Sequence, residues 1–429
     1  MTVEQIAALA PAFTDYLRCF KPCFVTQKSF AHLGAYCRGL LSDLPRKSVE
    51  PIALAAGRAV RTLQEFLTQH VWDHGRMRDD IQRRIVRDHL PAPGAGPPQG
   101  GVGTVAWIDE TSVAKKGDKT PGVQRQYCGA SGKVDNCIVT VHLACRCGDF
   151  SAILDNDLYL PEETWDTGPA ATKRREEAHI PGEVIYTSKW LLALGQIRHA
   201  MANGVRFDWL TFDEWYGGKP GFLAGLEDYG LLYVTEVPKN LPCFPSLPKY
   251  RSLQRPFASK PVENAGKWSK PFKGKPWKKV RLSRKTLGDQ VWEVRAAQVH
   301  LARDGRPLPR THWLIVARNP RTGEVKHFVS NAPPRTALKT LLKVAFTRAG
   351  VEHLFRLAKS EIGFGHFEGR IYQGLMRHMT LCQLVLLFAA EQTGRLRGEK
   401  PGGDGGADGA GVEHAVPRVA RAPLEAASG

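Results

Sequence analysis

A run of proline and glycine near residue 95 divides this 429-residue chain into two parts with different hydrophobic periodicity. Residues 91–101 read Pro-Ala-Pro-Gly-Ala-Gly-Pro-Pro-Gln-Gly-Gly, a composition typical of a linker. Before it, apolar residues recur at helical spacing over Val3–Leu17, Gln27–Leu41, Val49–Val71 and Met77–His89. We therefore predict an N-terminal all-α domain over residues 1–90, with DNA binding as one of its possible roles, and a linker over residues 91–102.

After the linker the pattern changes to that of strands. Apolar or alternating runs rich in β-branched residues predict strands at Val105–Thr111, Val134–Cys145 and Phe150–Leu158. A helix around Ser188–Asn203 and a buried strand at Phe207–Phe212 follow. Three strands, a helix and a further strand is the order of a ribonuclease H-like core. We expect an α/β fold, with residues 103–237 as the first part of that core.

The rest of the chain predicts an interruption of the core and then its completion. Strands at Val291–Val299, Thr311–Ala317 and Lys326–Ser330 indicate a basic, β-rich insertion over residues 238–335. Helices expected at Thr336–Gly363 and Ile371–Gln392 would complete the core over residues 336–396. The Gly/Ala/Asp-rich segment at 397–429 is expected to be a disordered tail.

Positive charge is concentrated in the insertion. The formal net charge of the chain is +18. The segment from Lys239 to Lys285 supplies +13 of this charge, because it contains fourteen Lys/Arg residues and one acidic residue. A basic segment with interleaved aromatic rings suits a surface that follows phosphates and stacks on bases, although a solvated loop would look similar. The candidate DNA contacts are Trp268, Lys270, Lys273, Lys275, Trp277, Lys278 and Lys279.

The sequence also indicates where the protein resides. The nine cysteines show no paired metal-ligand spacing, as expected of free thiols in a reducing compartment. The start of the chain lacks the pattern of a signal peptide, and the longest apolar run, Leu381–Ala390, is too short to span a bilayer. We expect a cytoplasmic protein.

Two aspartates at strand ends and a distant glutamate on a helix predict a site that binds metal ions. Asp109 follows the strand Val105–Ile108, and Asp213 follows the strand Trp209–Phe212. Glu352 lies on a helix whose apolar residues form one stripe, and Arg348 and Lys359 fall within about 40° of Glu352 beside that stripe. Carboxylates in such an arrangement can hold the pair of Mg²⁺ ions that assists phosphodiester cleavage, and the two cations can hold phosphates.

Other assignments stay open at this point. Glu110 and Glu214 each directly follow one of the two aspartates, and only one of two neighbours on a strand can point into a site. Glu352 could simply pair with Arg348 on a solvated face. Further acidic candidates are Asp118, Asp155, Asp157 and Glu368.

Three blocks of the sequence resemble the catalytic blocks of bacterial insertion-sequence transposases of the DDE superfamily. The first is Trp107-Ile108-Asp109-Glu110-Thr111 with the following Lys115-Lys116-Gly117 and Gly122–Tyr127, and the second is Leu210–Gly217. In the third, Arg348, Glu352 and Lys359 match the last three members of a Tyr-Arg-Glu-Lys signature at its spacing. The chain departs from the pattern at two positions. The group's Tyr is replaced by Ala345, which is followed by Phe346, and an Asp of the group is replaced by Gly365.

This resemblance implies a DNA transposase that cuts the ends of an insertion sequence and joins them to target DNA. It implies that Asp109, Asp213 and Glu352 bind two Mg²⁺ ions, with Mn²⁺ able to substitute, and that Arg348 and Lys359 position phosphates. The implied partner is double-stranded DNA, bound by a homodimer across paired ends at the bacterial nucleoid. The alternatives are a catalytically inactive DNA-binding relative and a stand-alone ribonuclease H-like endonuclease.

Overall fold

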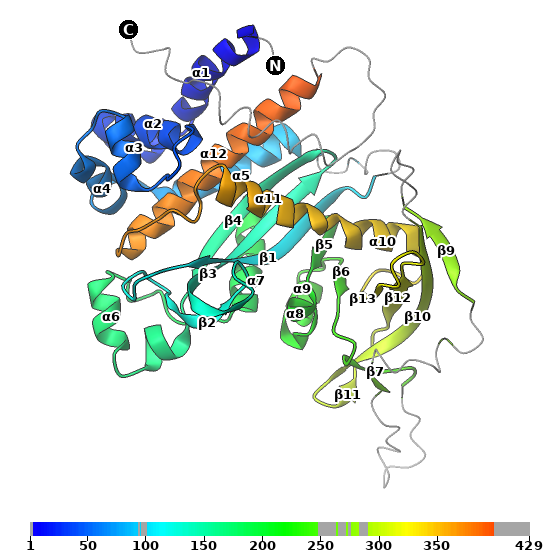
Figure 1. Ribbon diagram of the computed structural model, residues 1–429. Helices are drawn as coiled ribbons and strands as arrows, with labels where there is room; N and C mark the ends of the chain where they lie inside the picture. Colours follow the sequence, from blue (N-terminus) through cyan, green and yellow to red (C-terminus); the bar gives the residue numbers. More distant parts are fainter. Residues whose placement is uncertain are drawn as a thin grey trace. The chain divides into compact units, whose positions relative to one another are not determined.

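The computed structural model describes residues 3–92, 95, 101–247, 263–264, 272, 276–282 and 291–398 (Figure 1). The described residues form two compact units. The first takes them from the segments Met1–Ala95, Asp109–Arg206 and Gly350–Gly429, and the second from Gly96–Ile108 and Phe207–Ala349. The division cuts strand β1 (Thr104–Ala114) between Ile108 and Asp109, so each unit contains one half of that strand.

The first unit contains most of the helices: α1 (Val3–Arg18), α2 (Gln27–Leu41), α3 (Val49–Ala55), α4 (Val60–Thr68), α5 (His74–His89), α6 (Ala171–Glu177), α7 (Lys189–Ala202), α11 (Ala349–Ser360) and α12 (Tyr372–Gly398). It also has a 3-10 turn at Lys21–Cys23 and a π turn at Glu163–Thr167. Side-chain caps mark two of the starts, because Thr26 Oγ1 accepts from Ser29 N at 3.2 Å and Asp73 Oδ1 accepts from Arg76 N at 2.8 Å.

The N-terminal helices were correctly predicted from periodicity, with one exception. A single helix over Val49–Val71 is wrong, because α3 ends at Ala55 and α4 begins at Val60. Gly57 lies between them with φ +61°, a left-handed conformation that glycine adopts without strain and that ends a helix.

Helix α12 lies at the centre of the first unit, among α2, α4 and α5 (Figure 1). Its Arg377 is fully buried, stacks over the Trp72 ring at 4.5 Å, and donates to the backbone oxygens of Leu67 and Trp72 at 3.1 and 2.8 Å. On the sheet side, Gln383 Nε2 donates to Leu154 O at 2.9 Å. One long helix thus holds the N-terminal helices and the strands together. Among the described helices, none is both long and apolar enough to cross a membrane.

The strands of the first unit are arranged around β3. They are β2 (Gln124–Cys128), β3 (Lys133–Cys147), β4 (Phe150–Tyr159) and the second half of β1. The first part of β3 pairs antiparallel with β2 and the second part, from Val139 on, pairs antiparallel with β4. Strand β1 is the neighbour of β3 in this sheet, and β2 is an edge strand.

The second unit contains the first half of β1 paired in parallel with β5 (Trp209–Phe212), and a larger antiparallel sheet. The strands of that sheet are β6 (Val234–Glu236), β7 (Pro242–Phe244), β8 (Glu263–Asn264), β9 (Lys278–Arg281), β10 (Val291–Arg303), β11 (Arg306–Pro307), β12 (His312–Arg318) and β13 (Val325–Ser330). Its helices are α8 (Glu214–Gly217), α9 (Pro220–Asp228) and α10 (Leu338–Thr347).

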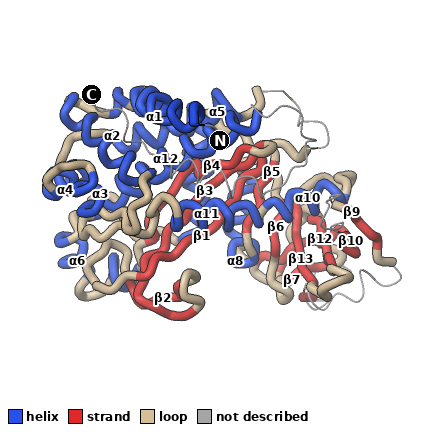
Figure 2. The backbone as a smooth tube through the Cα atoms, turned by 45° about the horizontal axis from the view of Figure 1, so that its top comes forward, coloured by secondary structure: helices blue, strands red, loops and turns tan. Residues whose placement is uncertain are grey.

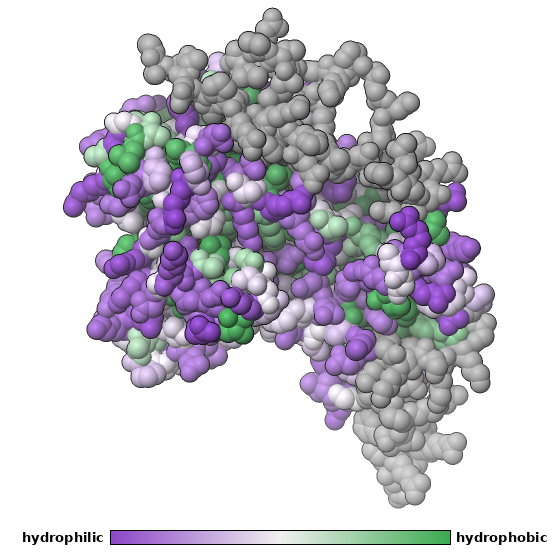
Figure 3. Space-filling view, viewed as in Figure 1, coloured by the Kyte–Doolittle hydropathy of each residue, from purple (hydrophilic) through white to green (hydrophobic). Residues whose placement is uncertain are grey.

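The predicted α/β class is confirmed by this mixture of helices with two sheets, which Figure 2 distinguishes by colour. The predicted helix over Thr336–Gly363 occurs as α10 and α11, which are separated by a turn at Arg348 and end at Ser360. The face of the molecule in Figure 3 is mostly hydrophilic, with hydrophobic side chains in small separate groups among the coloured residues.

Candidate active site

The first strand carries two neighbouring acids in its middle, between the buried residues Ile108 and Thr111. Trp107 and Ile108 are fully buried, whereas Asp109 and Glu110 are half-buried. The Glu110 carboxylate accepts from Lys189 Nζ at 2.5 Å, at the start of α7. Asp109 Oδ1 accepts from the backbone N of Glu110 at 2.8 Å. Glu110 is therefore paired with a lysine.

The second aspartate caps a short helix. Asp213 Oδ1 accepts from both Trp215 N and Tyr216 N at 3.1 Å, so it forms the N-cap of α8. Both of these bonds fall on Oδ1. Burial raises the pKa of Asp213, and the opposing effects of the Tyr216 N–H and the Arg348 guanidinium are smaller. Its neighbour Glu214 is exposed to solvent, which favours Asp213 as the ligand here.

The register of β1 and β5 relates the two aspartates. The pairs run in parallel from Val105 with Trp209 to Ile108 with Phe212. Asp109 and Asp213 are the next residues after that last pair. Asp213 lies at the carboxyl end of β5, a recurrent position for ligand sites in α/β proteins, whereas β1 continues past Asp109 to Ala114.

Helix α11 has the two faces that the sequence predicts. Val351, Leu354, Phe355 and Ala358 are buried, while Glu352 is exposed. Burial lowers the pKa of Lys359, and the charges of Cys128 and Asp109 oppose that effect. Lys359 and Asp109 both belong to the first unit, and the Asp109 charge opposes the fall in the pKa of Lys359.

Each unit thus places one predicted cation near one predicted aspartate. Arg348 acts on Asp213 in the second unit, and Lys359 acts on Asp109 in the first. Over the described residues, no three His, Cys, Asp or Glu side chains gather closely enough to hold a metal ion. A site with three carboxylate ligands is therefore a proposal, based on where the chain carries each of them.

The signature's tyrosine position is occupied by a core residue. Ala345 is buried in α10, and the neighbouring Phe346 ring packs at 4.7 Å from the Trp292 ring and 5.7 Å from the Phe328 ring. Trp107 Nε1 donates to Thr347 Oγ1 at 3.1 Å, which joins α10 to β1 within the second unit. The residues at this end of α10 therefore pack against other residues of the second unit.

Three of the candidate DNA contacts of the basic segment are among the described residues, on β9 and at the residue before it. Lys278 and Lys279 are exposed on β9. Trp277 is half-buried, with the Arg295 and Arg318 guanidinium carbons 4.5 and 4.7 Å from its ring centroid. The ring is therefore already in contact with two cations. Trp268, Lys270, Lys273 and Lys275 lie outside the described residues.

Of the other acidic candidates, Asp155 and Asp157 belong to an ion cluster formed with Arg78, Asp79 and His199. Arg78 Nε donates to Asp155 Oδ1 at 2.8 Å, and Gln196 Nε2 donates to Asp157 Oδ2 at 2.9 Å. Burial opposes ionisation of Asp155, but Arg78 and His199 outweigh it and lower its pKa. Burial raises the pKa of Asp157 despite Arg78. These side chains hold α5 and α7 to β4, so we assign them a structural role.

The two remaining acids lie at the surface. Glu368 is exposed and forms an ion pair with Arg46. Asp118 is exposed in the loop that follows β1.

His199 gives the ion cluster a pH dependence. Its Nδ1 and Nε2 each lie 2.6 Å from a carboxylate oxygen, of Asp155 and Asp79 respectively, so both nitrogens must carry protons. The hydrogen bond to Asp155 raises the pKa of His199 against burial, with Asp79 adding to the rise and Arg78 opposing it. A raised histidine pKa stabilises the fold below about pH 6.5, and this contribution is lost as the pH rises through the folded-state pKa.

We therefore expect His199→Gln to lower the melting temperature more at pH 6 than at pH 9. The comparison is wild type against variant by thermal unfolding at each pH. A control is His179→Asn, because His179 is exposed and its φ of 51° is tolerated by Asn. The same loss at both pH values would contradict the charged role of His199.

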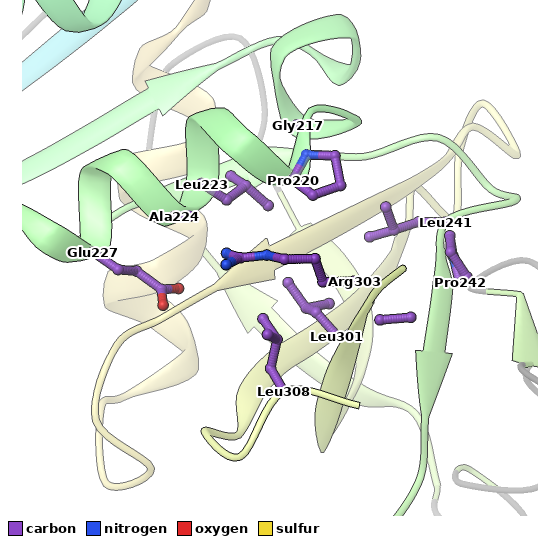
Figure 4. Close-up of a pocket in the computed structure, with 11 residues that line it drawn as sticks. Gly217, Pro220, Leu223, Ala224, Glu227, Leu241, Pro242, Leu301, Arg303 and Leu308 are labelled. Carbon is purple, nitrogen blue, oxygen red and sulfur yellow. The ribbon is translucent and has the colours of Figure 1, made fainter. Parts of the chain in front are cut away.

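The second unit also contains a pocket that is lined by residues of α8, α9, β7 and β10 (Figure 4). Its lining is mostly apolar, with Leu223, Leu301 and Leu308 around the extended Arg303 side chain. Glu227, on its rim, accepts from Tyr233 Oη at 3.0 Å and from His312 Nε2 at 2.7 Å. These contacts fix α9 to the antiparallel sheet, so we assign this pocket a packing role.

Comparison with known proteins tests the resemblance of the three sequence blocks to those of DDE-superfamily transposases. A protein-family model described as DDE superfamily endonuclease matches residues 19–289, a span that includes Asp109 and Asp213 and ends before Glu352. The chain is also 26% identical over 381 residues to a "Probable transposase for insertion sequence element IS701" of Microchaete diplosiphon, covering 86% of this chain and 84% of that protein. The resemblance predicted from the motifs is confirmed. This chain belongs to the DDE superfamily of endonucleases.

Proposed function

We propose that this endonuclease is a DNA transposase, which cuts the ends of an insertion sequence and joins them to target DNA. The observation that carries the proposal is the β1–β5 register, since Asp109 and Asp213 each directly follow the last paired residues, Ile108 and Phe212. Family membership and the similarity to the IS701 protein support the same reaction.

The proposal assigns β1, β3, β4, β5 and α7 to a ribonuclease H-like core. Supporting it, β1 neighbours the antiparallel strand β3 and pairs in parallel with β5. In the proposed organisation, residues 1–90 form an N-terminal helical domain, 103–237 and 336–396 form the core, and 238–335 form an inserted β-rich domain. The strands β9, β10, β12 and β13 support a β-rich insertion.

Asp109, Asp213 and Glu352 are the side chains that would hold the metal ions. All three supply the hard carboxylate oxygens that Mg²⁺ prefers, with Mn²⁺ as a substitute. Burial raises the pKa of Asp213, and a bound cation would offset that cost of ionisation. Two such ions, when bound, supply positive charge that activates the attacking oxygen and stabilises the leaving oxygen.

The remaining residues act on the DNA backbone. Arg348 and Lys359 would each contact a phosphate near the cleaved bond, because the charge of each cation acts on one of the aspartates. The exposed Lys278 and Lys279, together with Trp277, would hold the DNA along the insertion. The same role is proposed for Trp268, Lys270, Lys273 and Lys275. A homodimer across paired ends, associated with the nucleoid, completes the proposal.

The test is cleavage and strand transfer on a plasmid that carries the gene's own flanking DNA, with Mg²⁺ or with EDTA. Wild type should release the element in Mg²⁺ and insert it into a second plasmid. Glu352→Gln should bind the DNA but release no element, because a neutral amide is a poor Mg²⁺ ligand. Glu361→Gln, just after the same helix, is the control and should retain activity.

The outcome separates the two alternatives. Salt-sensitive DNA binding by wild type with no cutting in Mg²⁺ would indicate a catalytically inactive DNA-binding relative. Metal-dependent cutting without joining would indicate a stand-alone endonuclease of the same fold.

A further inference from the structure

An exposed aromatic side chain lies on the β2–β3 hairpin of the first unit. Tyr127 is 67% exposed, and Val134, its partner in the strand register, is 57% exposed. Tyr127 is the most exposed aromatic residue in the described part of the chain. Arg125, two residues earlier on β2, is exposed as well, so alternation places it on the same face as Tyr127. We call Arg125, Tyr127 and Val134 the hairpin face.

The hairpin is held firmly in place. Ala130 N, in its turn, donates to Ser112 Oγ of β1 at 3.1 Å. Asn136 Nδ2 donates to Lys115 O and Gly117 O at 2.7 and 2.8 Å. On the opposite face, Cys128 and Cys137 are fully buried. The exposed apolar pair is therefore presented by a rigid element and does not result from a loosely packed loop.

The charge around the hairpin face indicates an anionic partner. Between Lys115 and Asn136 the sequence has five basic residues and two acidic ones. Lys116, Arg125 and Lys133 are exposed, while Lys119 pairs with Glu177 at 2.6 Å. An exposed apolar pair amid net positive charge suits DNA, where phosphates border apolar sugar and base edges.

The shape and position of the hairpin agree with that partner. A two-stranded antiparallel ribbon fits the major groove of double-stranded DNA. Ser112, which holds the turn, lies on β1 only three residues after Asp109. Figure 2 shows β2 at the end of the long strands, on the same side of its unit as α6. DNA bound at Asp109 would therefore continue over a neighbouring part of the same sheet.

We propose that the hairpin face is a DNA-binding surface, with Arg125 against a phosphate and the Tyr127–Val134 pair against sugar or base edges of double-stranded DNA. The proposal rests on the proposed function, because it adds contacts to the substrate of that reaction. The competing occupant is a second copy of this chain, since β2 is an edge strand and such edges can pair with another strand.

The experiment measures binding of full-length protein to a fluorescent duplex of the gene's flanking DNA, in EDTA and at several salt concentrations. Arg125→Ala should weaken binding and reduce the slope of log affinity against log salt by about one, the effect of one lost phosphate contact. Tyr127→Ala should weaken binding about tenfold with the slope unchanged, because its contact is apolar. The control is Tyr229→Ala, a tyrosine that is 37% exposed in the second unit.

Thermal unfolding verifies that each variant folds, and sedimentation reports its oligomeric state. Wild-type affinity in both folded variants would overturn the proposal. So would a DNA-free dimer that Tyr127→Ala dissociates while DNA affinity stays unchanged, which would identify the face as an interface between copies. Because binding is measured without metal, wild type that binds DNA but fails to cut it would contradict the proposed function alone.

Discussion

Replacing Asp213 by Asn should lower the rate of metal-dependent DNA cleavage at least about a thousandfold, because the amide removes a charged metal ligand. The fold should survive this change. Asn is as good an N-cap as Asp, so its side-chain oxygen can still accept from Trp215 N and Tyr216 N and preserve the start of α8. DNA binding in EDTA should also persist. Asp213→Asn therefore tests the role of this residue in DNA cleavage without disrupting the fold or DNA binding.

The matched control is Glu214→Gln at the next position. Glu214 is exposed in the first turn of α8, and the loss of its charge should change the cleavage rate by less than about threefold. Conversion of supercoiled plasmid to nicked and linear forms in Mg²⁺ measures both variants, and thermal unfolding reports whether each is folded. An inactive Glu214→Gln beside an active Asp213→Asn would show that the ligand is the glutamate.

Much of the fold follows from hydrophobic periodicity, and the misses have physical causes. The bounds of α2 match the prediction at both ends, because an apolar stripe and a capping residue coincide there. Strand β2 was not predicted, since Gln-Arg-Gln-Tyr-Cys lacks an apolar alternation. That strand buries only Cys128 and is held by its pairing with β3, which periodicity does not report. The break at Gly57 was missed because helical spacing resumes at Val60.

The strand-end prediction is right for Asp213, which directly follows β5, and wrong for Asp109, which lies in the middle of β1 because that strand continues to Ala114. The apolar stripe on α11 correctly predicted that Glu352 lies on the exposed face of that helix. The ion pair between Glu110 and Lys189 was not predicted, because the two residues are distant in the sequence. The three-carboxylate arrangement itself remains a prediction.

The ion cluster was missed for a similar reason. Its members come from α5, β4 and α7, and no local pattern marks charged residues that will be buried together. Asp155, Asn156 and Asp157 are three consecutive polar residues in β4, a pattern that would suit solvent-exposed positions equally well. Only the tertiary structure shows that Asp155 is buried against Arg78.

Replacing Arg78 by Met should lower the free energy of unfolding by about 3–5 kcal/mol, one of the largest losses expected from a single change in this protein. The Arg78 side chain is only 15% exposed and the Asp155 side chain 1%, so removing the guanidinium leaves a buried carboxylate without its main counter-charge. Met fills a similar volume, which limits the loss from packing. Urea unfolding followed by circular dichroism, at a fixed pH, measures the change.

Two further variants test whether the uncompensated charge is the cause. Arg76→Met, on the same helix, removes an arginine that is 51% exposed and lies 3.8 Å from Asp80, and it should cost less than about 1 kcal/mol. The double variant Arg78→Met/Asp155→Leu should be more stable than Arg78→Met alone, because it removes the buried charge together with its partner. If the double variant were instead less stable by the sum of both single losses, lost packing rather than charge would hold α5 against β4.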